Sequence, residues 1–221
     1  RRPFQAGAAL QALARQEFEA LSAALTAAGV QVHVFDDTPE PHTPDSIFPN
    51  NWVSFHADGT VVLYPMLAPN RRVERRVDLL EALRQHGLRC SRLVDLSGHE
   101  AQAPFLEGTG SMVLDRQQRI AYACLSSRTH LAVLQDFAAQ LEYQICAFDA
   151  HDAQGMPIYH TNVLMCIGER FAVVCSPAIA ADQREQVLDS LRSGGRELVE
   201  LTLAQMNAFA GNMLELASAD G

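Results

Sequence analysis

Residues 52–65, WVSFHADGTVVLYP, contain the pattern on which the fold prediction depends. Two short runs of apolar residues flank Asp58-Gly59, a dipeptide typical of the tight turn in a β-hairpin. The charged segment 71–86, RRVERRVDLLEALRQH, has apolar residues at helical spacing and ends at Gly87. The next segment, CSRLVDL, has the composition of a strand. The predicted structural unit is therefore strand, strand, helix, strand.

This unit recurs twice further along the chain. The second copy consists of SMVLD, the turn RQQ, IAYACL, a helix over 129–141 and the strand YQICAF. The third consists of NVLMCIG, a turn around Glu169, FAVVCS, a helix over 180–192 and the strand ELVELT. The turns fall near positions 58, 116 and 169, with a fourth near 220. A period of about fifty to sixty residues indicates an α/β fold built from repeats.

The segments outside the three units fit parts of the same repeat. Residues 7–28 have helical periodicity and end at Gly29, and VQVHVF over 30–35 alternates like a strand. NMLELA over 212–217 predicts the first strand of a fourth hairpin, and the sequence stops at its turn. Unpaired backbone groups in a buried strand are costly. We therefore expect residues 1–221 to form a single domain that is incomplete at the C-terminus and at the N-terminus.

Composition and charge exclude several classes of protein. With 48% hydrophobic and 19% charged residues, the chain can build a sizeable core. Its net charge is -9 and its densest basic run is RRVERR, so no nucleic-acid partner is expected. No apolar run approaches the roughly 20 residues of a membrane span, and no signal-peptide pattern opens the chain. The five cysteines form no CxxC pair, so we expect no metal site and no disulfide framework, and a reducing cytoplasm fits.

The chemically unusual residues share one phase of the repeat, the approach to each hairpin. In chain order they are Asp45 and Asn51, then Glu107, then His160 and Asn162, and finally Gly211 and Asn212. If the units surround a pseudo-symmetry axis, equivalent positions meet there, and a carboxylate, an imidazole and amides converge. Proton-transfer chemistry needs such a convergence.

Each of these residues also has an ordinary explanation. Asp45 can cap a turn beside Pro44, and His160 can be a hydrogen-bonded core histidine. Glu107 opens Glu-Gly-Thr-Gly, which can be a plain turn. We expect a strand rather than a helix to follow it, which argues against a dinucleotide-binding motif. The shared phase in the repeat favours the functional interpretation over these alternatives.

Several of these segments resemble motifs of the pentein superfamily, which includes dimethylarginine dimethylaminohydrolases, arginine deiminases and amidinotransferases. DSIFPNNW is similar to a substrate-binding stretch of these enzymes, and NRRVER, FLEGTG and LSSRT are similar to further motifs. YHTNV resembles the catalytic-histidine segment and FAGNM the segment after it. The resemblance covers almost the whole chain and is closest to the citrulline hydrolases. It implies a truncated α/β propeller, with ββαβ units around a pseudo-five-fold axis, that forms a catalytic domain.

Carried onto this sequence, the resemblance implies a catalytic pair and a substrate site. His160 would act as general acid and base, and Glu107 would hydrogen-bond it and raise its basicity. Asp45 would hold the α-ammonium group of the substrate. Asn51 and Asn162 would lie among the residues that bind the substrate.

The resemblance also implies that arginines bind the α-carboxylate of the substrate. Arg128, with Arg71 or Arg72, would take this role, which suits a planar bidentate guanidinium. For Arg71, a solvated helix face explains the pattern equally well. Arg128 lies in a turn of small residues, SSRT, before a predicted helix, which favours its functional interpretation.

Two features depart from the family pattern. Asn51 stands where arginine-directed relatives have an aspartate, and an amide suits a neutral ureido group, which favours citrulline over arginine. The glycine-rich segment with the family's nucleophilic cysteine is absent here, so we expect that cysteine beyond residue 221. Cys166 and Cys175 are predicted to lie inside hairpin strands without a neighbouring base, unlike reactive thiols.

The reaction that the resemblance implies is hydrolysis at the ureido or guanidino carbon of an amino acid. It proceeds through a cysteine-linked intermediate and needs no metal or organic cofactor. The partner is then a small-molecule amino acid, with no nucleic acid and no membrane, and a homodimer is left open. Three alternatives remain: amidino transfer to an amine, a non-catalytic binding role on the same fold, and an inactive fragment.

Overall fold

The computed structural model describes residues 7–218. The chain separates into two compact units, one made of Arg1–Asp36 with Glu215–Gly221 and the other of Asp37–Leu214. The first unit contains helix α1, Ala8–Ala27, as its periodicity predicted. In the described part of the chain, no helix is long and apolar enough to cross a membrane. The single-domain organisation stays a prediction.

Two predicted strands are wrong. Residues 30–35 and 212–217 are irregular, and none of the three sheets in the described part of the chain includes them. Alternating side chains show which residues can share a face, but a strand forms only where another strand completes its hydrogen bonds. The turn predicted near residue 220 lies outside the described residues.

The first ββαβ unit begins with the predicted hairpin. Strands β1, Val53–Phe55, and β2, Thr60–Leu63, are antiparallel, and β3, Arg92–Asp95, pairs with β2 in parallel. Gly59 adopts φ +84° in the hairpin turn, a left-handed conformation that favours glycine. Asp58 stabilises the turn by accepting a 2.8 Å hydrogen bond from the N–H of Thr60.

The single helix predicted over 71–86 is wrong, because this segment contains two helices. Five residues separate helix α2, Pro69–Arg72, from α3, Asp78–Gln85. In the interruption, Arg75 forms an ion pair with Glu100. Long-range contacts of the arginines therefore override the local helical periodicity. The parallel β2–β3 connection still crosses over through α3, as a parallel pair requires.

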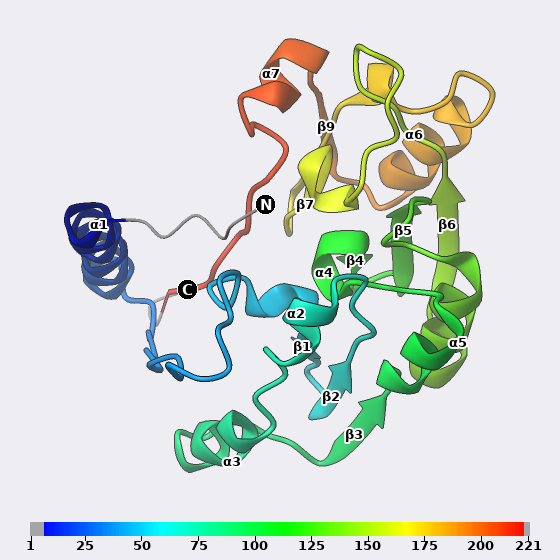
Figure 1. The fold of residues 1–221 in the computed structure, drawn as a ribbon. Coiled ribbons are helices and arrows are strands. Elements are labelled where there is room, and N and C mark those ends of the chain that lie inside the picture. The colour runs from blue at the N-terminus through cyan, green and yellow to red at the C-terminus, as the bar shows by residue number, and fades with distance from the viewer. Residues whose placement is uncertain (1–6, 219–221) are drawn as a thin grey trace. The chain divides into compact units, whose positions relative to one another are not determined.

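The second unit follows the predicted order closely. Strands β4, Val113–Asp115, and β5, Ile120–Cys124, form the hairpin, and β6, Gln144–Phe148, pairs with β5 in parallel. Helix α5, Leu131–Leu141, connects them and lies alongside β6 (Figure 1). The helix begins two residues later than the sequence predicted.

The third unit repeats the same topology. Strands β7, Met165–Ile167, and β8, Phe171–Val174, are antiparallel, and β9, Glu197–Glu200, pairs with β8 in parallel. Helix α6, Arg184–Ser193, forms the crossover. Three consecutive ββαβ units of the mixed α/β class are therefore present, as predicted.

Buried hydrophobic clusters connect each ββαβ unit to the next. Phe137 of α5 packs in one buried cluster with Val62 and Tyr64 of the first unit. In the same way, Leu188 of α6 shares a cluster with Tyr122 of the second unit. Each such buried side chain contributes about 1.5–3 kcal/mol. Because α5 and α6 each pack against residues of the preceding unit as well as their own, the approaches to successive hairpins are held next to one another.

Short helical turns precede the hairpins, and the sequence did not predict them. They are the 3-10 turn Pro49–Asn51, helix α4, Gly108–Ser111, and the 3-10 turn Thr161–Val163. Helix α4 contacts both 3-10 turns. The prediction that a strand directly follows Glu107 is wrong, since α4 comes before β4. The remaining short helices are Ser97–Gln102, Ser176–Ala178 and α7, Leu203–Asn207.

Candidate active site

Two glycines of α4 allow the site to form. Gly108 has φ +48°, and a Cβ there would collide with the main-chain carbonyl of Asn50. A Cβ on Gly110 would lie 2.9 Å from Nδ1 of His160 and would collide with Nδ2 of Asn51. The absence of these side chains lets the approaches to three hairpins meet within hydrogen-bonding distance.

Glu107 and His160 form a buried pair at this meeting point. Glu107 is fully buried and His160 is 6% exposed. The distance between Nε2 of His160 and Oε2 of Glu107 is 2.8 Å. An ionised carboxylate only accepts hydrogen bonds, so Nε2 carries the hydrogen and donates it. Nδ1, which lies next to Gly110, is then the nitrogen that can exchange a proton with a ligand.

Glu107 remains ionised although it is buried. Desolvation by burial opposes its negative charge, but the hydrogen bond from His160, the 3.0 Å hydrogen bond from the N–H of Leu67 and the charge of Arg128 outweigh that cost. Together these contacts lower the pKa of Glu107 below its ordinary value. The carboxylate can therefore orient the imidazole and stabilise its protonated form.

Arg128 connects this pair to the surface of the site. Its NH1 lies 3.1 Å from Oε2 of Glu107, and its guanidinium lies over the ring of Tyr159 at 5.3 Å. The same Tyr159 ring contacts the imidazole of His160, with centroids 4.8 Å apart. The side chain of Arg128 is 31% exposed, so part of the guanidinium is open to a ligand.

Arg71 belongs to a second buried network. It is 5% exposed and forms an ion pair with Glu74 at 3.0 Å. Its NH1 donates a 2.9 Å hydrogen bond to Oδ1 of Asn51. The carboxylate of Asp45 lies 3.8 Å from Nε of Arg71, and its side chain is half exposed. Burial raises the pKa of Glu74, although its contacts with Arg71 act in the opposite direction.

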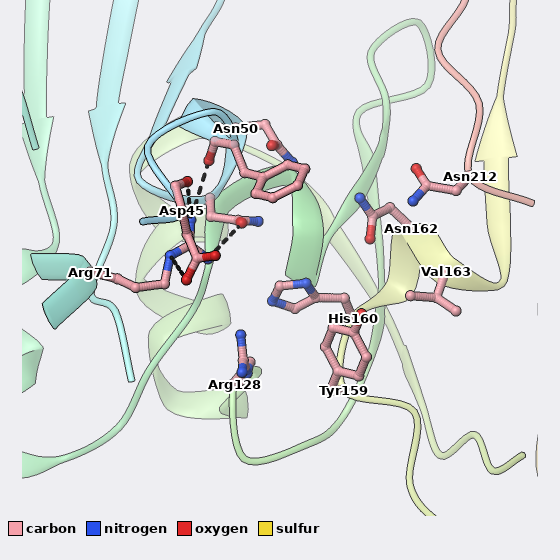
Figure 2. A pocket seen from close by; sticks show the side chains of 11 residues that line it. Asp45, Asn50, Arg71, Arg128, Tyr159, His160, Asn162, Val163 and Asn212 are labelled. Carbon is pink, nitrogen blue, oxygen red and sulfur yellow. Dashed lines mark hydrogen bonds and ion pairs between the residues drawn. The ribbon is translucent and has the colours of Figure 1, made fainter. Parts of the chain in front are cut away.

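A pocket of about 310 Å³ opens between these networks (Figure 2). The imidazole of His160 points toward the side where Asp45 and Asn50 lie, and Asn162 and Asn212 lie on the other side. The pocket is lined by Asp45, Phe48, Asn50, Asn51, Arg71, Arg128, Tyr159, His160, Asn162, Val163 and Asn212. Convergent polar groups in a concave site of this size suit a small polar ligand.

Most of the predicted site residues meet in this pocket. Six line it and Glu107 supports His160 from behind, whereas Arg72 bonds to the main-chain carbonyls of Met66 and Leu67 instead. Sequence reasoning missed Asn50, Tyr159 and Val163, each of which is adjacent in sequence to a predicted residue, and Phe48, which lies three residues from both Asp45 and Asn51. It also missed Glu74, for which the sequence contains no signal.

The described cysteines lie away from the pocket. None of Cys90, Cys124, Cys146, Cys166 and Cys175 lines it. Burial raises the pKa of Cys124 and of Cys146 to about 11, and it also raises the pKa of Cys175. These thiols stay protonated at neutral pH, which is unsuitable for a nucleophile. Within residues 7–218 no cluster of three or more metal-binding side chains occurs.

Three ββαβ units with a buried carboxylate–imidazole pair at a polar pocket are the features of the pentein enzymes that modify guanidino groups. The family model described as "N,N dimethylarginine dimethylhydrolase, eukaryotic" matches residues 3–221, and the chain belongs to this family. The sequence resemblance had placed this family among the related groups. A search of curated proteins gave no significant match.

Solved structures of pentein enzymes share the fold. ArgZ, an arginine dihydrolase from the ornithine–ammonia cycle in Cyanobacteria, matches with a TM-score of 0.72 and 18% identity over 93% of this chain. AgrE matches with a TM-score of 0.70 and 20% identity over 91% of this chain. SxtG, an amidinotransferase from Microseira wollei, matches with a TM-score of 0.59 and 14% identity over 95%. The chain spans 30% of ArgZ, 27% of AgrE and 80% of SxtG.

Proposed function

We propose that this chain supplies the acid–base and substrate-binding groups of a hydrolase that acts on the ureido or guanidino carbon of an amino acid. The observation that carries the proposal is the 2.8 Å hydrogen bond between buried His160 and Glu107 at the wall of a polar pocket. A complex of a related structure, AgrE, contains L-arginine. The family model and this geometry support the same chemical class.

In the proposed reaction, a cysteine thiolate attacks the central carbon of the substrate and forms a tetrahedral intermediate. Protonated His160 gives its proton to the leaving nitrogen as the carbon–nitrogen bond breaks. Neutral His160 then removes a proton from water, which attacks the same carbon and releases the thiolate. Glu107 stabilises the imidazolium, which exists before the first step and forms again when His160 deprotonates water, and this is why its ionised state matters.

The substrate's amino-acid end would bind at the charged rim of the pocket. Asp45 is placed to hold the α-ammonium group, and Arg128 to hold the α-carboxylate with the guanidinium nitrogens that Glu107 does not occupy. Asn162 lines the same pocket and would add a hydrogen bond. We further propose that the attacking cysteine lies outside the 221 residues, in a propeller with a pseudo-five-fold axis.

Turnover by the full-length protein tests this proposal. We expect His160→Ala to lower kcat for hydrolysis of L-citrulline or L-arginine by at least about a hundredfold, the usual contribution of general acid–base catalysis. His151→Ala is the matched control, because His151 is exposed and does not line the pocket. Release of ammonia and formation of the product amino acid would be measured for both variants.

Unchanged turnover in His160→Ala would reject the catalytic role. Adding an acceptor amine to the same assay separates hydrolysis from amidino transfer, because a transferase forms a new guanidino product only when the acceptor is present. Absence of turnover with both substrates, with or without the amine, would favour a binding role.

A further inference from the structure

The hydrogen bonds of Arg71 leave little of its guanidinium for a ligand. Its Nε and NH2 donate to the carboxylate of Glu74, and NH2 also lies 3.4 Å from the main-chain oxygen of Asp45. NH1 donates to Oδ1 of Asn51. These contacts use four of the five N–H groups of a guanidinium. The contacts therefore favour an internal role for Arg71 over binding of the α-carboxylate.

Arg71 fixes the orientation of the amide of Asn51. A guanidinium has no acceptor, so the atom of Asn51 at 2.9 Å from NH1 must be the carbonyl oxygen. The amide nitrogen then points away from Arg71. It lies beside Gly110, where Nδ1 of His160 also lies.

The rest of the amide's surroundings hold this orientation. Asn51 is 5% exposed, and Gly108 packs against its main-chain carbonyl. Arg71 is itself held by Glu74, which is 3% exposed, so the positive charge is neutralised within the protein. Among the described residues that line the pocket, Asp45 is the only carboxylate. Next to His160, the pocket wall therefore offers a neutral donor.

We propose that Arg71 is a positioning residue that turns Asn51 into a hydrogen-bond donor, so that the site selects a neutral ureido oxygen over a cationic guanidinium. An amide that could rotate would accept from a guanidinium as readily as it donates to a ureido group. Fixed by Arg71, it matches only the carbonyl acceptor, and a guanidinium N–H would meet another donor. This inference rests on the proposed function for its substrate class and selects between the two groups named there.

The test compares binding of L-citrulline and L-arginine to the full-length protein by calorimetry. The wild type is expected to bind citrulline more tightly. Asn51→Asp replaces the donor by an acceptor and is expected to shift the ratio of dissociation constants toward arginine at least about tenfold, since an unmatched buried polar group is costly. Arg71→Met frees the amide and is expected to shrink the preference, whereas Arg71→Lys keeps a donor and should retain more of it.

Arg76→Met is the matched control, because it removes an arginine that pairs with exposed Asp78 and does not line the pocket. Its ratio of dissociation constants should equal that of the wild type. An unchanged ratio in Asn51→Asp, or in folded Arg71→Met, would overturn the inference, as would a wild type that binds neither ligand. If circular dichroism shows that Arg71→Met is unfolded, Asn51→Asp decides.

Turnover of the same samples separates this inference from the proposed function. Citrulline that is bound selectively but never hydrolysed would contradict the hydrolase proposal and leave the role of Arg71 intact. Hydrolysis with no difference in selectivity between the wild type and Asn51→Asp would contradict the role of Arg71 and leave the hydrolase proposal intact.

Discussion

Two titratable residues, Glu107 and His56, show how the surroundings of a side chain determine its charge. Glu107 is fully buried, yet hydrogen bonds from Leu67 and His160 compensate for its lost hydration and lower its pKa. His56 is partly buried between the rings of Phe137 and Tyr143. Desolvation by burial, followed by the charge of Arg116, lowers its pKa to about 4. The folded state therefore keeps Glu107 charged and His56 neutral near neutral pH.

The neutral His56 predicts a dependence of stability on pH. Between pH 6.5 and about 4 the unfolded chain protonates this imidazole and the folded chain does not, so stability falls as the pH falls through that range. The loss should be about 1–2 kcal/mol after allowance for solvent screening. His56→Gln should remove that part of the loss, and exposed His42→Gln should not. Urea unfolding at pH 7 and pH 4.5 gives the loss of unfolding free energy for the wild type and for each variant. An equal loss in the wild type and in His56→Gln would contradict the prediction.

At the scale of the elements, the sequence predicted the helices and hairpins that local contacts determine. The hairpins, α5 and α6 were found because their turns and apolar spacing are local signals. The helix over 71–86 was predicted as one element, because nothing local shows that Arg75 pairs with Glu100. The strands over 30–35 and 212–217 failed for the same reason, since pairing depends on a distant partner. Glu107 and His160 could be predicted from their common phase, but the orientation of the Asn51 amide depends on tertiary packing.

Helix α4 is the element in which one added methyl group should lower both stability and activity. A Cβ at position 110 would press on Nδ1 of His160 and on Asn51, and overpacking of this kind costs about 1–3 kcal/mol. We expect Gly110→Ala to lower kcat/KM for hydrolysis at least about tenfold, because the imidazole and the amide must move. Gly98→Ala is the control, since a Cβ there meets nothing within 4 Å. Equal activities of the two variants would show that the close approach at Gly110 is not required.

At the scale of the whole molecule, a buried ion pair joins two of the repeated units. Arg196, just before β9, donates to both oxygens of Asp115 at the end of β4, with NH1 at 2.6 Å and NH2 at 3.1 Å. The side chains are 5% and 2% exposed. The pocket draws residues from the approaches to successive units, so this pair helps to fix the frame in which they meet.

Removal of one partner of this pair should therefore destabilise the chain strongly. Arg196→Met leaves the carboxylate of Asp115 buried without its cation, which typically costs about 3–5 kcal/mol. Adding Asp115→Asn removes that uncompensated charge and should restore part of the loss. Arg192→Met is the control, because the ion pairs of Arg192 with Glu185 and Asp189 are exposed, and this variant should change stability by less than about 1 kcal/mol. Unfolding in urea gives the free energies of unfolding of the wild type, Arg196→Met, the double variant and Arg192→Met. If the double variant is no more stable than Arg196→Met, the arginine does not act by compensating the buried charge of Asp115.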